Sequence, residues 1–196
     1  MSSEVFVSSD ESPIDQRNLA QSSTNDSKYG LNLLYDGADA DRPDVDFVAV
    51  HGIGGHPLNS FTDGETGCCW LRDLLPRDSP RCRVFSYGYK ALNDRFFWSS
   101  TWDAAWELKQ ALVEQATTRR RIFICHSTGG LLVKYALTVA HRYQQSVDVY
   151  KFTSGIVFLG TPHRDSSSAD LTITLEKIKT LGYRHNIALF RQLSRT

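Results

Sequence analysis

Residues 121–132 read RIFICHSTGGLL, and this stretch decides which fold the chain adopts. An apolar run that ends at Cys125 leads into a short polar turn, and a helical pattern follows from Thr128. Ser127 lies at the tip of that turn. Strand, sharp turn and helix in this order are typical of a G-x-S-x-G nucleophile elbow, although Cys125 stands in place of the first glycine. The alternative is an ordinary βα turn that happens to contain a serine.

Outside this stretch, apolar segments alternate with helical patterns. Strands are predicted at 31–35, 45–52, 81–89, 119–126 and 154–160, and helices at 68–76, 101–116, 128–143 and 169–181. The inner strands are apolar throughout, as expected of strands that are buried on both faces. The alternation predicts an α/β fold with a doubly wound, mostly parallel sheet.

Three of these segments carry more specific expectations. The helix at 68–76 should stop at Pro76, and the strand at 154–160 should be buried. In the helix at 101–116, Trp102 and Trp106 are four residues apart and should pack into the core with Leu108. The other reading of the aromatic cluster at 96–106 is that it lines an acyl pocket or touches a lipid surface.

Composition places the chain among ordinary globular proteins. Its 196 residues are enough for one domain with a hydrophobic core, and 41% are hydrophobic and 22% charged. We expect a disordered polar tail at 1–30 and a single domain at 31–196. The tail has no apolar core that would make it a secretory signal, and no run approaches the roughly 18 apolar residues of a membrane span.

Charge and cysteine content exclude several kinds of partner. The formal net charge is zero, which gives no support to a nucleic-acid partner. The four cysteines form no C-x-x-C pair and have no matching histidine spacing, so neither a disulfide framework nor a zinc site is expected, and a reducing, intracellular compartment fits best. We therefore expect no metal and no cofactor.

Three polar turns follow predicted strands: HGIGGHP at 51–57, the turn at Ser127, and TPH at 161–163. The carboxyl ends of parallel strands share one edge of a sheet, so these turns should form one site. The glycine-rich turn does not bind nucleotides, because G-K-[ST] is absent and Pro57 breaks a dinucleotide fingerprint.

Chemistry at this site would centre on Ser127 as a nucleophile. The N–H of Thr128, at a helix N-terminus, and the N–H of Ile53, in the glycine-rich turn, would form the oxyanion hole. His163 is the candidate base, with Asp165 beside it; the alternative is that His163 only shapes the rim. His185 is a further histidine in the same part of the chain.

Five motifs occur in the order and spacing of a known group: VAVHGIGGHPLNSFT, CCWLRDLLP, RVFSYGY, FICHSTGGLLVKYAL and GIVFLGTPHR. Across residues 31–165 the chain resembles the serine esterases of the α/β-hydrolase superfamily. In particular it resembles the serine active site-containing protein family, which is related to lipase-like GPI inositol-deacylases and has fungal members. The resemblance implies Ser127 as nucleophile, an ester or lipid-acyl substrate, and peripheral association with mitochondrial or endoplasmic reticulum membranes.

The same resemblance leads us to expect further strands, bearing the catalytic acid and base, beyond Thr196. The chain is therefore expected to be a C-terminally incomplete hydrolase domain, a fragment from a fungal protein, in which 154–160 is an edge strand. An apolar edge promotes self-association. A serine without its base is a poor nucleophile, so weak esterase activity is expected. A second function therefore stays open: a hydrolase-like domain that serves as a binding or regulatory module.

Overall fold

A computed structural model of the chain describes residues 28–37, 44–90, 97–115 and 117–163. Residues 1–27 of the predicted tail, the predicted helix at 169–181, and both Asp165 and His185 lie outside the described residues. The division into a tail at 1–30 and a domain at 31–196 therefore stays a prediction.

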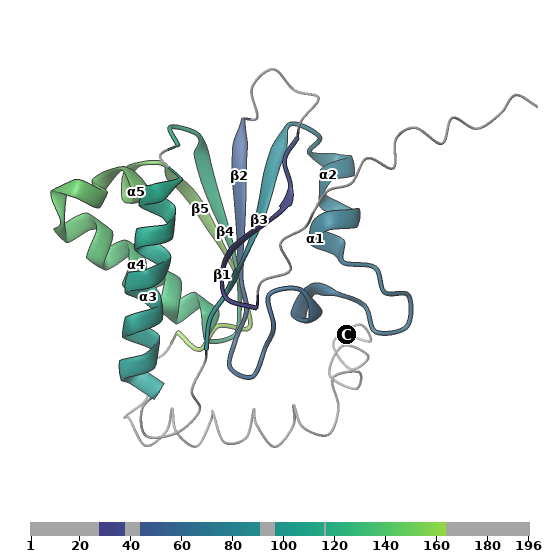
Figure 1. Cartoon of the computed structure of the whole chain (residues 1–196), viewed down its shortest axis with the longest axis horizontal. Helices are drawn as coiled ribbons and strands as arrows, with labels where there is room; N and C mark the ends of the chain where they lie inside the picture. Colours follow the sequence, from purple (N-terminus) through teal and green to yellow (C-terminus); the bar gives the residue numbers. More distant parts are fainter. Residues whose placement is uncertain (1–27, 38–43, 91–96, 116, 164–196) are drawn as a thin grey trace, which may run out of the picture.

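A five-stranded, mostly parallel sheet forms the centre of the molecule (Figure 1). Its strands are β1 (Gly30–Tyr35), β2 (Val45–Val50), β3 (Cys82–Gly88), β4 (Arg120–His126) and β5 (Thr153–Leu159). They lie in the order β1-β3-β2-β4-β5. Strand β1 runs antiparallel to β3, and every other neighbouring pair is parallel. The prediction of a mostly parallel α/β sheet is confirmed.

Helices cover both faces of this sheet. They are α1 (Trp70–Asp73), α2 (Leu75–Asp78), α3 (Phe97–Glu114), α4 (Gly129–Arg142) and α5 (Val147–Lys151), with 3-10 turns at Asn59–Phe61 and Gln144–Ser146. Helices α3, α4 and α5 lie together on one side of the sheet, and α1 and α2 lie on the other (Figure 1).

The alternation of side chains along β2 explains why there are two cores. Val48 and Val50 belong to a buried cluster with Leu108 of α3 and Leu132 of α4. Ala49, between them in the strand, belongs to a second cluster with Leu71 of α1. Successive strand residues point to opposite faces, so an uninterrupted apolar strand is needed where both faces are covered.

Pro76 does not end a helix, which corrects the prediction for 68–76. The segment forms two short helices, α1 and α2, and Pro76 lies in the first turn of α2. Proline is tolerated in the first turn because the N–H that it lacks would have no partner within the helix. The break comes at Leu74, which ends α1 and precedes α2.

Trp102 and Trp106 are not core residues, which corrects the prediction for the helix at 101–116. They are 45% and 38% exposed, whereas Ala105 and Leu108 are completely buried. The two indoles lie at the margin of the apolar stripe and make edge-to-face contacts with Tyr135 and Tyr143. An aromatic ring can lie over the side of a neighbouring helix without entering the core, so helical spacing alone overstated their burial.

Strand β5 is less buried than its apolar sequence predicts. Val157, Phe158 and Leu159 are 45%, 36% and 40% exposed. Within the described residues β5 pairs with β4 alone and lies at the edge of the sheet. An edge strand has a neighbouring strand on one side only, so its apolar side chains can stay partly exposed. Apolar composition alone therefore does not distinguish such a strand from a fully buried one.

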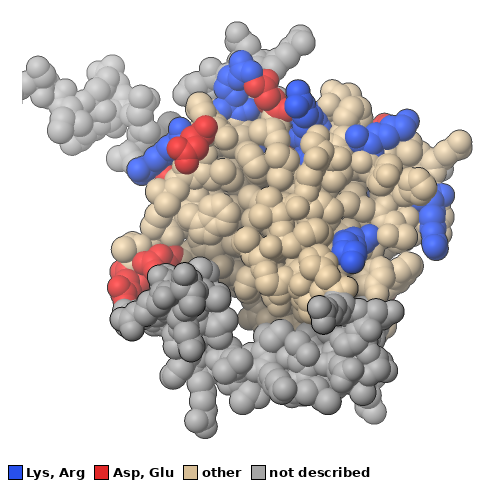
Figure 2. All heavy atoms as spheres, turned by 180° about the vertical axis from the view of Figure 1, so that it is seen from behind, with Lys and Arg blue, Asp and Glu red and all other residues tan. Residues whose placement is uncertain are grey.

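Charged side chains gather along one margin of the molecule, at the top of Figure 2, and much of the remaining described surface in that view is uncharged. The same margin holds the amino ends of β2 and β3 (Figure 1). Ion pairs join Asp44 to Arg81 and Asp46 to Arg83 there. None of the helices in the described part of the chain is both long enough and apolar enough to cross a bilayer.

Candidate functional site

Ser127 occupies the sharp turn between β4 and α4 with a φ of +52°. It is the one non-glycine residue with positive φ in the described part of the chain. Such a conformation costs free energy for an L-residue and persists where the surroundings hold it in place. Its N–H donates to the Leu159 carbonyl at 2.8 Å, and its carbonyl accepts from the Thr161 hydroxyl at 2.9 Å. The strained turn is thus anchored to β5 and to the residues that follow it.

Two glycines let the chain approach Ser127 closely. A Cβ on Gly52 would lie 2.7 Å from the Ser127 Cβ and 3.2 Å from its Oγ. A Cβ on Gly129 would lie 2.5 Å from the carbonyl oxygens of both Val50 and His51. Any side chain at either position would push the glycine-rich turn away from the serine. Two predicted site segments, 51–57 and the turn at Ser127, therefore meet in the structure.

Cys125, which stands in place of the first glycine of the elbow motif, is completely buried. Its side chain belongs to the cluster beneath α3 and α4, with Val50 and Leu132 among its members. Burial raises the pKa of the Cys125 thiol to about 12, so the group stays protonated and unreactive at neutral pH. Cys125 packs as a small apolar side chain.

The two predicted oxyanion donors lie in the two segments that meet here. The Ile53 N–H donates to the Thr128 hydroxyl at 3.0 Å. The Thr128 N–H, at the start of α4, donates to no acceptor among the described residues. The Thr128 side chain is 1% exposed, so the hydroxyl is held inside the junction. The sequence pattern predicted a role for the backbone of Thr128, and nothing in it pointed to the side chain.

His51 is a structural residue of the site. It is 1% exposed and stacks on Tyr89, with 4.5 Å between ring centroids. Its Nδ1 lies 2.8 Å from the Gly52 carbonyl, and its Nε2 accepts from the Tyr89 N–H at 3.4 Å. The Tyr89 hydroxyl donates back to the His51 carbonyl at 2.9 Å. This pairing fixes the tautomer that carries its proton on Nδ1 and holds the start of the glycine-rich turn.

Burial lowers the pKa of His51 to about 4, and the hydrogen bond to Gly52 offsets part of that effect. His51 is therefore neutral at pH 7. Burial also raises the pKa of Tyr89. Tyr89 follows β3, and nothing in the local sequence SYGY distinguishes it from the other tyrosine, Tyr87, so its role could not be predicted.

His163 follows the carboxyl end of β5 and makes no hydrogen bond to Ser127 among the described residues. Its exposed ring makes an edge-to-face contact with Phe158, with 4.4 Å between centroids. Thr161, two residues earlier, holds the Ser127 carbonyl. The third predicted turn therefore reaches the same edge of the sheet, and the assignment of His163 as base stays a proposal. Among the described residues, no group of three or more potential metal ligands comes together.

Fold and site together define a mixed α/β protein that holds a strained serine at a strand-to-helix turn, against a glycine-rich loop. A scan against models of known protein families finds no match to the chain.

Among curated proteins the chain is similar to Protein SERAC1. The identity is 26% over 175 residues for Bos taurus, 26% over 184 for Homo sapiens and 29% over 174 for Danio rerio. These alignments cover 76%, 81% and 74% of this chain, but 26%, 27% and 26% of those proteins. The chain thus spans about a quarter of the length of these relatives. All three are vertebrate proteins, which gives no support to a fungal source.

Proposed function

We propose that this chain has the α/β-hydrolase fold and acts as a serine hydrolase on carboxylic esters, with Ser127 as the nucleophile. The observation that carries the proposal is the positive φ of Ser127 at the turn between β4 and α4, with Gly52 against its side chain. A strained serine at the tip of such a turn, crowded by glycines, is the geometry of a nucleophile elbow.

The position of the turn within the sheet supports the same proposal. From the central strand β2 the chain passes to β3 on one side and then to β4 on the other. Ligands of open α/β sheets bind where the strand order reverses in this way, outside the carboxyl ends of the strands. The loop that follows β2 contains Gly52, and the turn that follows β4 contains Ser127, so both segments lie at that point.

In the proposed reaction, the Ser127 Oγ attacks the ester carbonyl carbon while a base accepts its proton. The carbonyl oxygen becomes an oxyanion, which the N–H groups of Thr128 and Ile53 would stabilise. The protonated base then donates that proton to the leaving alkoxide oxygen, so that the alcohol departs and an acyl group remains on Ser127, and water then releases the acyl group as a carboxylic acid. His163 is the proposed base. Because Ile53 donates to the Thr128 hydroxyl, that side chain has to rotate before the Ile53 N–H can serve the oxyanion.

The proposed substrate class is an ester, including lipid acyl esters, and the proposed location is the periphery of a mitochondrial or endoplasmic reticulum membrane. Exposed apolar side chains support contact with lipid or with a second copy of the chain. They include Trp102 and Trp106 on α3 and Val157, Phe158 and Leu159 on β5.

Labelling with a fluorophosphonate probe tests the proposal, because an activated serine displaces fluoride from the probe and forms a phosphonate ester, whereas ordinary serines do not react. We expect one labelled site, which Ser127→Ala removes. Ser154→Ala is the matched control, because it also removes one serine hydroxyl, but from an exposed position at the start of β5. Absence of labelling in a chain shown to be folded by circular dichroism would overturn the hydrolase and favour the binding or regulatory module.

A further inference from the structure

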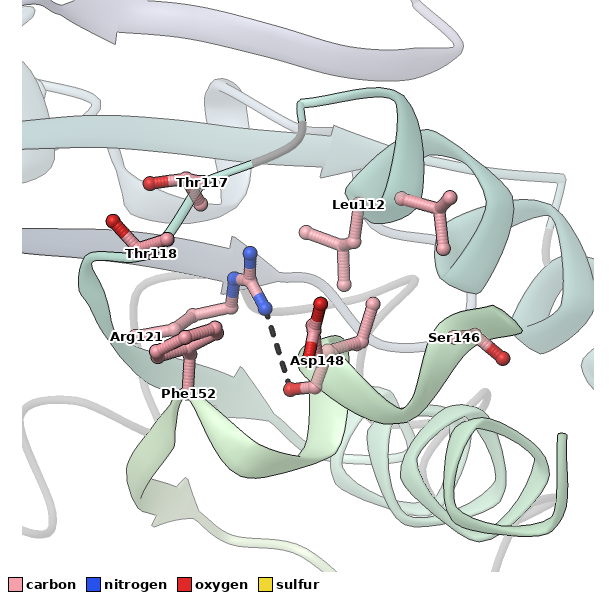
Figure 3. Close-up of a pocket in the computed structure, with 9 residues that line it drawn as sticks. Leu112, Thr117, Thr118, Arg121, Ser146, Asp148 and Phe152 are labelled. Atoms are coloured by element: carbon pink, nitrogen blue, oxygen red, sulfur yellow. Dashed lines mark hydrogen bonds between the residues drawn. The ribbon is translucent and has the colours of Figure 1, made fainter. Parts of the chain in front are cut away.

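Figure 3 shows a pocket of about 200 Å³. Its lining includes Arg121 at the start of β4, so the pocket lies at the amino end of the sheet, whereas Ser127 follows the carboxyl end of β4. The pocket is lined by the end of α3, the segment that precedes β4, the start of β4, and the α5 region, and it is open to solvent on one side. Pockets for drug-sized ligands measure roughly 300–1,000 Å³, so this pocket suits a smaller molecule.

Arg121 of β4 supplies the pocket with a buried positive charge. The residue is 2% exposed, and its guanidinium points into the pocket in Figure 3. A guanidinium has five N–H donors. In the described part of the chain this one makes a single hydrogen bond, from Nη1 to the Val149 carbonyl at 3.3 Å. A buried charge is costly unless it is paired, so the pocket favours an anionic group beside Arg121.

The nearest carboxylate in the sheet is already engaged. Asp46 of β2 lies in register with Arg83 on one side and Arg121 on the other. Both of its oxygens accept hydrogen bonds from Arg83 at 2.8 Å, and Arg119 lies 4.0 Å away. Three guanidinium groups thus surround one carboxylate. Burial lowers the pKa of Arg121, the Asp46 charge offsets part of this effect, and Arg83 adds to it.

The remaining walls limit what the anion can be. Leu112, Val113 and Phe152 form an apolar side, which suits a ligand with a small apolar body. Asp148, an exposed residue of α5, also lines the pocket, and no ion pair joins it to Arg121 among the described residues. Its carboxylate disfavours a ligand with two negative charges, such as phosphate, and favours one that carries an amino group as well.

We propose that this pocket binds a free apolar α-amino acid. The ligand's carboxylate pairs with the Arg121 guanidinium, for which a planar bidentate contact is the preferred geometry. Its ammonium group lies toward Asp148, and its side chain rests against Leu112, Val113 and Phe152. The pocket is separate from the Ser127 site, so this binding does not depend on hydrolase activity.

Isothermal titration calorimetry of the whole chain tests the assignment with L-leucine and three probes that each lack one feature. These are 4-methylpentanoate, which has no amino group, 3-methylbutylamine, which has no carboxylate, and inorganic phosphate. We expect leucine to bind and each probe to bind at least tenfold more weakly. No heat with leucine at millimolar concentration overturns the proposal, as does equal or tighter binding of any of the three probes.

Variants then connect binding to the named residues. Asp148→Asn should weaken leucine binding at least tenfold and leave the affinity for 4-methylpentanoate unchanged or higher. The matched control is Asp103→Asn, which removes an exposed carboxylate elsewhere, on α3, and should have no effect. Arg121→Lys should abolish binding of both ligands. If Arg121→Lys does not fold, Asp148→Asn still tests the proposal. Unchanged leucine affinity in Asp148→Asn would contradict the proposed orientation of the ligand.

Discussion

The backbone N–H of Ile53 donates a hydrogen bond to the side-chain hydroxyl of Thr128, which lies 75 residues further along the chain. The bond ties the glycine-rich loop after β2 to the first turn of α4. It joins the two residues whose N–H groups would form the oxyanion hole. The Thr128 side chain thereby sets the distance between the two proposed N–H donors. It also keeps the Ile53 N–H hydrogen-bonded in the resting protein.

Replacing Thr128 with valine keeps the shape of the side chain and removes the acceptor. The partly buried N–H of Ile53 would then have no partner, which should cost about 1–3 kcal/mol of unfolding free energy. Thr128→Ser keeps the hydroxyl and should cost less. Urea denaturation measures both variants. A valine variant as stable as the parent would show that the hydrogen bond does not hold the loop.

Gly52→Ala tests the close approach to the elbow. The added Cβ would lie 2.7 Å from the Ser127 Cβ, so the loop or the turn has to move. We expect a loss of about 1–3 kcal/mol in unfolding free energy, with reduced fluorophosphonate labelling. Gly64→Ala is the control, because nothing lies within 4 Å of its added Cβ, and it should change stability by less than about 0.5 kcal/mol. Similar results for the two variants would contradict the tight junction.

Ser127 stores backbone strain that a glycine would release. The left-handed conformation costs an L-residue roughly 1–2 kcal/mol, while glycine adds about 0.5–1 kcal/mol of unfolded-state entropy. Ser127→Gly should therefore be more stable than Ser127→Ala by up to about 1 kcal/mol. Both variants lack the hydroxyl, so neither should label. Thermal melts compare them, and an alanine variant of equal or greater stability would argue against strain at this turn.

His51 makes stability depend on pH. Its pKa is about 4 in the folded protein and 6.5 as an ordinary histidine, so between these values the unfolded chain binds a proton that the folded chain does not. The contribution of His51 is complete above pH 6.5 and is lost as the pH falls toward 4. It amounts to about 3 kcal/mol. In urea titrations from pH 7 to pH 4, His51→Asn should show a shallower decline than the parent, and equal slopes would contradict the assignment.

His163→Gln tests the proposed base directly. A general base typically contributes 10²–10⁴-fold to a rate, so the second-order rate of fluorophosphonate labelling should fall at least about a hundredfold. The residue is exposed, so the melting temperature should stay close to that of the parent. Unchanged labelling would assign the base to another residue and leave His163 as part of the rim.

Most of the fold could be predicted from local pattern. The five strands and the helices α3 and α4 lie within a few residues of the predicted ranges, because burial on one or both faces imposes a period that the sequence displays. The short α5, Val147–Lys151, was missed, since five residues are too few to show a helical period. The sharp turn at Ser127 was predicted because the apolar strand and the glycines that flank it are contiguous in the sequence.

The sequence by itself determined the order of strands and helices, and with it the edge of the sheet at which Ser127, Gly52 and Thr161 come together. Tertiary structure alone decided the contacts between distant residues. It placed the Thr128 hydroxyl on Ile53, stacked His51 on Tyr89, and enclosed Arg121 in a pocket. The physical reason is that periodicity records only which face of an element is buried. Which side chain meets which across the fold depends on the packing of whole elements.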